Sequence, residues 1–580
     1  MHRRAWLVTL ALLLAGACEA GQDASTSTSG TNTAGAGGAG ASGGSGMGGG
    51  ITPPCNPICS DDLHAVVDCE GTILTACNDD EGCDLETATC INACQASENA
   101  KRSVGCEYYA VQMDQLNAQA CFAAFVANTW NTPAHISVER DGQPLAIETF
   151  AYLPIGFGPS LTYTPYDPVT GLMPGEVAIL FLAGDQGTPG PGSPVCPVMS
   201  ATPAGTQVVG TGRGHGFRVQ SDVPVVSYQI NPYGGGSAAI TGASLLLPTS
   251  AWGQDYLAMH AYHSGPHPTS FNVVAREDDT TVTLLPSANI DGGGGLPPGS
   301  ANDDYTVTLA AGEYIQLTQE SELDGSIVTS DKPVGFLAGA RCSFVPSGVQ
   351  ACDHLEQMIP PVRALGHHYA GVSHRTRSGE PSLWRLLGVV DGTTLSWSND
   401  VGGPRTIDRG ELVEVTTSFP FVVESQDADH PFVLMAHMTG GATNGMNGVG
   451  DADAVLAVPP EQYLSSYVFF TDPTYPATHV VVVRTQKDGM FHDVELDCAG
   501  VIGGWKKLGD FEYTYVDLMT GDFEPAGNCS TGLRTMRSDA RFGVWVWGWG
   551  SPQTTDFTAY VSYGYPAGMN VQLINAVELE

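Results

Sequence analysis

The amino-acid sequence predicts an all-β protein in which about four repeated, roughly seven-stranded β units follow a small disulfide-rich module. Three observations lead to this prediction. Of the 580 residues, 72 are Gly, 38 are Pro and only 14% are charged, which suits many short strands joined by turns. After about residue 101, alternating and β-branched runs are frequent, whereas helical periodicity is scarce. A set of short sequence phrases also returns in a fixed order along the chain.

Composition and charge also narrow the classes of function. Apolar residues make up 42% of the chain, which is enough to fill large cores, so a wholly disordered protein is excluded. The formal net charge is −38, and a polyanion of this size repels the phosphate backbone of nucleic acids. We therefore expect no nucleic-acid partner.

Residues 1–18 have the features of a bacterial lipoprotein signal. Two arginines precede an apolar run, residues 5–14, that is too short to span a bilayer as a stable anchor. Small residues then lead to Cys18 in the pattern of a lipobox, although Ala15 stands where a Leu is usual. A plain cleaved signal peptide is the alternative. We expect Cys18 to be acylated, and residues 19–54, rich in Gly, Ser and Thr, to form a flexible tether.

An acylated cysteine followed by a tether is the arrangement that a surface-displayed domain needs. After the signal, the sequence contains no window of 18 apolar residues that could form a transmembrane helix. We therefore predict an exported protein at the bacterial outer membrane or cell surface, attached to the membrane through its lipid only.

The cysteines predict disulfides throughout the exported chain. The sequence has 15 cysteines, and lipidation of Cys18 leaves an even number to form bridges. Many of them gather just after the tether, so we assign residues 55–100 to a small module that disulfides hold together. The spacings do not match the paired knuckles of a zinc site, and the connectivity within this module stays open.

Six further cysteines lie in the body of the chain. We pair them as Cys342–Cys352, which bracket a short loop, Cys498–Cys529, and, by elimination, Cys121–Cys196. A catalytic cysteine would instead need a free thiol of low pKa near a histidine, and His354 does follow Cys352 closely. Export favours the closed disulfide.

The body, residues 101–580, contains three phrases that recur in one order. The first is a strand, an Asp and then Pro with a second strand, as in residues 219–226 and 328–335. The second is a Pro followed by a Tyr, as in Pro248 and Tyr256, and the third is a turn between two strands. The set returns roughly every 100 to 110 residues, which predicts about four β-rich units.

Two architectures fit such units. About seven strand candidates per unit favour immunoglobulin-like sandwiches. The alternative is a β-propeller, in which the same strands are regrouped into four-stranded blades. The repeat is long for one blade of about 40 to 50 residues, so sandwiches are preferred.

The sequence shows no motif that predicts catalysis or metal binding. His260 and His263 would face opposite sides of a strand, so the histidine-rich segment that ends at His267 does not predict a metal site. Asp451 and Asp453 lack the pattern of a calcium loop, and we interpret them as solvated turn residues. We assign no catalytic residue, no metal ligand and no cofactor.

A row of tryptophans is the strongest candidate for a contact surface. Trp545, Trp547 and Trp549 alternate along one predicted strand and so share one of its faces. If exposed, they could form a platform that stacks on sugar rings or contacts a partner. The preferred alternative is a tryptophan-filled core, because the segment occupies the core-strand position of the last repeat.

Several segments of the body resemble bacterial IgGFc-binding-protein-like lipoproteins. They are residues 105–110, 221–225, 245–250, 351–360 and 560–568. The family takes its name from the N-terminal region of a secreted animal mucus protein that was named for binding the Fc part of IgG, and this chain lacks the von Willebrand-type D domains of that protein. The resemblance covers roughly residues 101–580 and implies an extracellular binding or adhesion region.

Together these features predict a cell-surface lipoprotein whose β-rich body binds a protein or glycan without catalysis. One alternative is a secreted hydrolase acting on polysaccharide or protein, and another is a passive structural protein of the envelope. A cleft with paired carboxylates or a Ser–His pair would favour the hydrolase, whereas an exposed aromatic patch would favour binding.

Overall fold

The computed structural model describes residues 56–579, except for 188–193, 236, 237, 239, 263, 265, 266, 443, 444, 446 and 555–557. These residues belong to one compact unit, which begins at Cys55. Cys18 and the predicted tether lie outside the described residues. In the described part, nearly all regular structure is β-strand, and the single α-helix, α1, spans Ala93–Ala100, which confirms the all-β class.

The disulfide-rich module consists of a small sheet, a hairpin and α1. The sheet contains β1 (Ile58–Cys59), β2 (Ala65–Val67) and β3 (Ile73–Ala76), and the hairpin contains β4 (Glu81–Asp84) and β5 (Thr89–Asn92). Asn92 begins the helix by accepting the backbone N–H of Gln95 at 3.2 Å.

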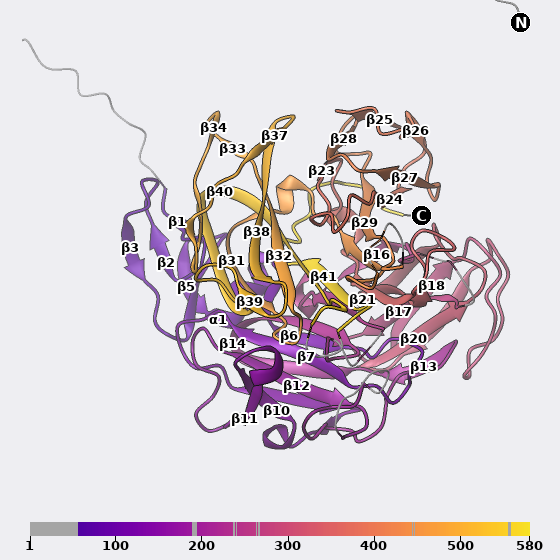
Figure 1. Ribbon diagram of the computed structural model, residues 1–580, viewed down its shortest axis with the longest axis horizontal. Coiled ribbons are helices and arrows are strands. Elements are labelled where there is room, and N and C mark those ends of the chain that lie inside the picture. The colour runs from indigo at the N-terminus through magenta and orange to yellow at the C-terminus, as the bar shows by residue number, and fades with distance from the viewer. Residues whose placement is uncertain are drawn as a thin grey trace, which may run out of the picture. The chain divides into compact units, whose positions relative to one another are not determined.

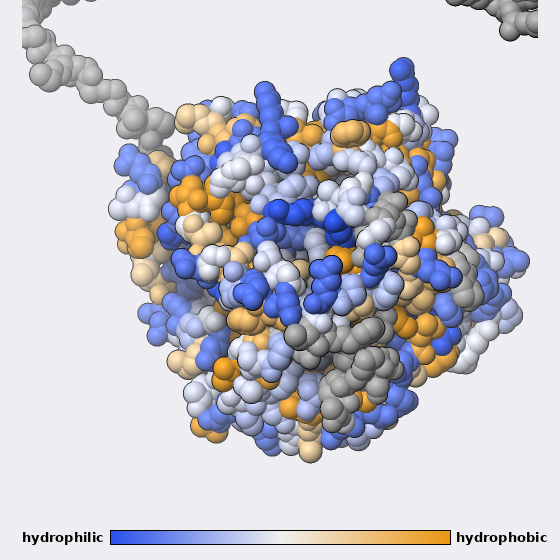
Figure 2. All heavy atoms as spheres, in the orientation of Figure 1, coloured by the Kyte–Doolittle hydropathy of each residue, from blue (hydrophilic) through white to orange (hydrophobic). Residues whose placement is uncertain are grey.

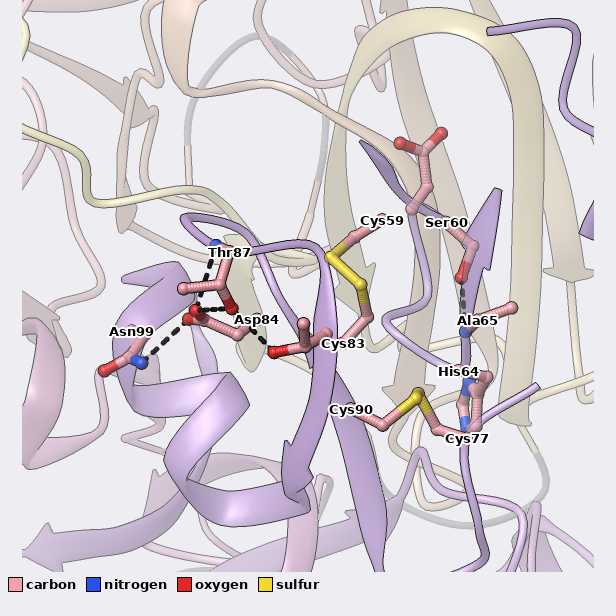
Figure 3. Close-up of a disulfide and its surroundings, with 12 residues drawn as sticks. Cys59, Ser60, His64, Ala65, Cys77, Cys83, Asp84, Thr87, Cys90 and Asn99 are labelled. Atoms are coloured by element: carbon pink, nitrogen blue, oxygen red, sulfur yellow. Dashed lines mark hydrogen bonds between the residues drawn. A yellow bond between two sulfur atoms is a disulfide. The ribbon is translucent and has the colours of Figure 1, made fainter. Parts of the chain in front are cut away.

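Disulfides join the parts of this module (Figure 3). Cys59–Cys83 and Cys77–Cys90 both connect the sheet side to the hairpin. Cys94–Cys106 ties α1 to the first strand of the body. Cys69 is also disulfide-bonded, and Cys55 lies outside the described residues. The module therefore depends on covalent links where it has too few residues for a large core.

The body contains the three disulfides that the sequence predicts. They are Cys121–Cys196, Cys342–Cys352 and Cys498–Cys529. Within the described residues, therefore, every cysteine is part of a disulfide.

The first unit of the body (residues 104–246) is a nine-stranded sheet built on the long strand β14 (Phe217–Asn231). The first half of β14 pairs with β6 and β8, and its second half pairs with β7 and β15. The other strands are β6 (Val104–Ala110), β7 (Phe122–Asn128), β8 (Ile136–Arg140), β9 (Gln143–Pro144), β10 (Ala151–Ile155), β11 (Thr162–Pro165), β12 (Val177–Ala183) and β15 (Gly242–Leu246).

The second unit (residues 253–358) repeats this plan around β21 (Ile327–Ser343) in an eight-stranded sheet. Here β16 and β18 flank the first half of the long strand, and β17 and β22 flank the second half. The strands are β16 (Gly253–Leu257), β17 (Thr269–Ala275), β18 (Thr280–Leu285), β19 (Tyr305–Leu309), β20 (Glu313–Gln319) and β22 (Asp353–Met358). The first unit supplies the eighth strand, β13 (Gly212–His215), which pairs with β20.

In the third unit (residues 368–456) the long strand is interrupted, and the unit forms two four-stranded sheets. β28 (Phe421–Ser425) pairs with β23 and β25, and β29 (Phe432–Met438) pairs with β24 and β30. The remaining bounds are β23 (His368–Gly371), β24 (Ser382–Gly388), β25 (Thr393–Trp397), β26 (Thr406–Ile407), β27 (Leu412–Thr417) and β30 (Asp453–Leu456).

The fourth unit (residues 464–566) has nine strands around β40 (Gly532–Trp549). β31 and β35 pair with the first half of β40, and β32 and β41 pair with its second half. The bounds are β31 (Leu464–Thr471), β32 (Ala477–Arg484), β35 (Val494–Leu496), β36 (Gly500–Val501), β37 (Lys506–Leu508), β38 (Phe511–Thr520), β39 (Glu524–Pro525) and β41 (Ser562–Pro566), and a separate small hairpin contains β33 (Gln486–Lys487) and β34 (Met490–Phe491). The second unit thus forms about the seven strands predicted, whereas the other three units have eight or nine, because short edge strands are added.

The first recurring phrase marks the place where each long strand changes its partners. The register of β14 shifts between Gln220 and Val225, and that of β21 shifts between Thr329 and Val334. In the third unit the same phrase, which ends at Pro431, separates β28 from β29. Proline cannot donate to a sheet ladder, so it fits a bulge at which pairing is interrupted.

The second phrase places a buried tyrosine against the long strand just after this shift. Each tyrosine hydroxyl donates to a backbone carbonyl and accepts the N–H of the residue three positions earlier. The hydroxyl of Tyr256 donates to the carbonyl of Val334 at 2.6 Å, that of Tyr369 donates to Phe432 at 2.9 Å, and that of Tyr467 donates to Phe542. The same three hydroxyls accept the backbone N–H groups of Gly253, Gly366 and Leu464, respectively. In the first unit, Tyr108 donates to Val225 in the same way at 2.6 Å.

The last strands of the four units contact one another in a cycle: β15 with β22, β22 with β30, β30 with β41, and β41 with β15. Figure 1 shows the colours of the units following one another around the body, from the violet first unit to the yellow last one. At the junctions, a Cβ atom added to Gly105, Gly253 or Gly366 would lie 2.5, 2.4 or 2.3 Å from a proline in the segment that leads into the next unit, so only glycine fits.

The C-terminal segment closes the cycle on the first unit. Ser103 donates its backbone N–H to the carbonyl of Met569 at 2.8 Å, and the hydroxyl of Tyr228 donates to the carbonyl of Ala567 at 2.6 Å. The cyclic order is a feature of a propeller. The units differ from single blades, because three of them combine two sets of strands on one long strand and the third unit divides its strands between two sheets.

Candidate functional site

Trp545 and Trp547 belong to the core of the fourth unit. Their side chains are 5% and 1% exposed, because β32 and β41 flank this half of β40. The indole N–H of Trp545 donates to the carbonyl of Leu456 at 3.0 Å. Trp549 is half-buried, with its ring 4.7 Å from that of His479. The burial of Trp545 and Trp547 agrees with the preferred tryptophan-filled core, and of the three rings only that of Trp549 is partly exposed.

The segments considered for metal binding are also largely buried. His260 is 1% exposed and lies 3.6 Å from Asp324, whereas His263 lies outside the described residues. Asp451 and Asp453 are fully buried where the last strands of the units meet, which corrects their interpretation as solvated turn residues. In the part of the chain that the structure describes, no group of three or more His, Cys, Asp or Glu side chains is placed to hold a metal ion.

The best candidate for a functional site is a groove of about 460 Å³ between the third and fourth units. The third unit contributes the loop between β23 and β24 and the loop between β27 and β28. The fourth unit contributes residues 503–504 and strand β38 with Lys506. Figure 2 shows strongly hydrophilic residues gathered between the elements of these two units. The volume lies within the range of about 300 to 1,000 Å³ that is usual for small-ligand sites.

A hydrogen-bonded chain of side chains lines one side of the groove. The hydroxyls of Ser382 and Ser373 lie 2.8 Å apart, and the Ser373 hydroxyl lies 2.9 Å from Nδ1 of His374. Nε2 of His374 lies 3.3 Å from a carboxylate oxygen of Glu380. Burial lowers the pKa of His374, so its imidazole is neutral near pH 7 and donates one N–H to Glu380.

Glu380 also fixes the backbone of this loop. Its carboxylate accepts the backbone N–H groups of Arg377 at 2.9 Å and Ser378 at 2.8 Å, together with the hydroxyl of Thr376 at 2.9 Å. The Arg377 side chain forms an ion pair with it at 2.9 Å. Burial opposes the negative charge, yet the hydrogen bond from His374 and the charge of Arg377 lower the pKa of Glu380 well below its usual range. The negative charge of Glu380 is therefore already neutralised within the loop.

Two cations and two tyrosines also line the groove. The guanidinium of Arg375 lies 5.6 Å from the ring centre of Tyr515, and the ammonium of Lys506 lies 5.8 Å from that of Tyr513. The two tyrosine rings pack edge to face, 5.9 Å apart. Arg375 also lies 3.2 Å from Asp517, in an ion pair that is partly exposed. Such an arrangement can bind an anionic group beside an aromatic surface.

An exposed aromatic residue and a buried one complete the lining. Phe419 is 71% exposed in the loop that follows β27, and Trp384 is 3% exposed. No sequence motif predicted this site, because its residues come from two units and approach only when the units pack. The recurrence of the units was the one signal that could have placed them side by side.

The comparisons with known proteins identify the family of the chain. The family model described as IgGFc binding protein matches residues 242–548, which include the second and third units, Arg375, Lys506 and Tyr515. A search of curated proteins finds no match. The matched region covers more than half of the 580 residues, and the chain therefore belongs to the IgGFc-binding protein family.

Proposed function

We propose that this chain is an exported, lipid-anchored surface protein that binds a protein or glycan partner, without catalysis, in the groove between its third and fourth units. The observation that carries the proposal is the groove itself, where cationic and aromatic side chains lie within residues that match a binding family. Phe419, at the rim of the groove, can bury its exposed ring against a ligand, and an aromatic side chain loses little conformational entropy when it does so.

Two observations support export and anchoring, the state of the cysteines and the N-terminal sequence. Every described cysteine is in a disulfide, which is typical of proteins that fold outside the reducing cytoplasm. None of the helices in the described part is long and apolar enough to cross a membrane. The sequence places a lipobox cysteine, Cys18, before a tether, and the two or more acyl chains of a bacterial lipoprotein terminus suffice for stable attachment at the outer membrane or cell surface.

Metabolic labelling tests the anchor. Cells that express the full chain are fed an alkyne-bearing palmitate, and the labelled protein is compared with the Cys18→Ser variant. The wild type is expected to carry the label and to fractionate with the outer membrane, whereas the variant loses both. Equal labelling of the two proteins contradicts the anchor.

Ligand capture tests the groove. The full chain in detergent is applied to an array of glycans and extracellular proteins that includes IgG Fc, beside the variants Tyr515→Ala and Tyr152→Ala. Both tyrosines are half-buried, but Tyr152 lies in β10 of the first unit. The expected result is a ligand that the wild type and Tyr152→Ala retain and Tyr515→Ala loses. If all three proteins retain the same ligand, the groove is not its site.

The hydrolase is the second candidate, because Ser373, His374 and Glu380 form a hydrogen-bonded chain in a groove. In serine hydrolases Nε2 of the histidine faces the serine and Nδ1 faces the acid, whereas here the order is reversed. The loop contacts of Glu380 give the acid a structural role. Labelling by a fluorophosphonate that is lost in Ser373→Ala, with turnover of an ester, peptide or polysaccharide substrate, would establish the hydrolase instead. A chain without ligand or turnover in either assay would be the passive envelope protein.

A further inference from the structure

The charges around the groove point to the chemical class of its ligand. The geometry points to an acidic saccharide, a sugar that carries a carboxylate or a sulfate, bound with its anionic group at Arg375 and Lys506 and its hydroxyls among the polar side chains of the groove. This inference rests on the proposed binding function and specifies it.

The cations of this groove are unusual for this protein. The chain has 23 Lys and Arg against 61 Asp and Glu, and yet two cations face one small groove. The Arg375 side chain is 42% exposed, and its Nη2 atom lies 3.2 Å from Asp517 and 3.4 Å from the backbone carbonyl oxygen of Tyr515. Lys506 is exposed, and its ammonium lies 5.8 Å from the ring centre of Tyr513. Both groups therefore have donors to offer to an anion.

The acidic groups near the groove leave this positive character in place. Glu380 is neutralised by Arg377 and by the N–H groups of its own loop. Asp517 pairs with Arg375 at 3.2 Å, with the two side chains 35% and 42% exposed. Exposed ion pairs contribute little net free energy, so a ligand anion can replace Asp517 or share the guanidinium with it.

The hydroxyl groups that line the groove favour an anionic sugar over an acidic peptide as the ligand. The Ser373 hydroxyl interacts with His374 and Ser382, and its second lone pair can still accept a hydrogen bond from a ligand. In the described structure the hydroxyls of Tyr513 and Tyr515 form no hydrogen bond, so they can donate to and accept from sugar hydroxyls.

The dimensions of the groove agree with this assignment. A volume of about 460 Å³ suits a small ligand, whereas a protein partner usually covers a flat surface of about 800 Å². The exposed ring of Phe419 offers an apolar surface to the C–H face of a sugar.

Calorimetric titration of the full chain in detergent tests the inference. The probes are a glucuronic-acid-containing disaccharide, its neutral glucose counterpart and the sulfated form of that counterpart. At least one acidic probe is expected to bind about tenfold or more tightly than the neutral sugar, and added salt is expected to weaken that binding. The two acidic probes distinguish a carboxylate from a sulfate ligand.

Variants assign the preference to the groove. Lys506→Gln and Arg375→Gln are each expected to reduce the preference for the acidic probe, while Arg537→Gln, on an exposed arginine of β40, leaves it unchanged. Lys506 is exposed, so its variant is expected to fold even if Arg375→Gln does not. Equal binding of acidic and neutral probes, or no binding of either, overturns the inference. The capture assay with Tyr515→Ala reports separately on the groove as a binding site.

Discussion

Replacement of the recurring tyrosines by phenylalanine should destabilise the protein although the ring is kept. In Tyr369→Phe, the carbonyl of Phe432 loses its donor at 2.9 Å and the N–H of Gly366 loses its acceptor at 3.0 Å. Tyr369 is 1% exposed, so water cannot replace either bond. Each buried polar group left without a partner costs about 1 to 2 kcal/mol, which gives a loss of roughly 2 to 4 kcal/mol in the free energy of unfolding.

Urea unfolding with the disulfides intact measures this loss. Tyr256→Phe and Tyr467→Phe should behave alike, because their hydroxyls make the same pair of bonds in the neighbouring units. Tyr515→Phe is the matched control, since no hydrogen bond in the described structure uses its hydroxyl, and it should change the free energy of unfolding by less than about 0.5 kcal/mol. If the three variants unfold like this control, the tyrosine hydrogen bonds do not stabilise the units.

Three further predictions concern the core, the buried carboxylates and the disulfides. Trp547→Ala removes a side chain that is 1% exposed, so calorimetry should show a loss of roughly 3 to 5 kcal/mol, whereas unchanged stability would mean that Trp547 is not core. Burial raises the pKa of Asp451 and of Asp472 to about 6, so the folded protein holds protons that the unfolded chain releases, and the stability falls as the pH rises from 5 to 7. In pH-dependent melting curves, Asp451→Asn should remove about 1 kcal/mol of this fall in stability. An unaltered pH profile would contradict the buried acid. Mass-spectrometric counting should find no free thiol in the native body, and loss of Cys342–Cys352 should cost about 2 to 3 kcal/mol; two or more free thiols would refute the pairing.

The sequence by itself determined the class of the fold and its repeated parts. The all-β class follows from alternation and turn residues, which act over a few neighbouring residues. The phrase around Pro224 and Pro333 marks a shift in register because proline lacks an N–H, and Tyr256 recurs because its hydroxyl satisfies two backbone groups at that shift. The pair Cys342–Cys352 also followed from local spacing.

Only the tertiary structure decided which surfaces are buried and where a ligand can bind. The sequence around Trp547 and around Asp451 does not reveal whether the side chain faces solvent or core. Both side chains are buried because β41 and β30 pack against the last strands of other units. Arg375 and Lys506 belong to different units, so no local pattern relates them. Their groove exists because the third and fourth units pack side by side. The closed cycle likewise depends on contacts between segments as distant as Ser103 and Met569, which no short-range periodicity encodes.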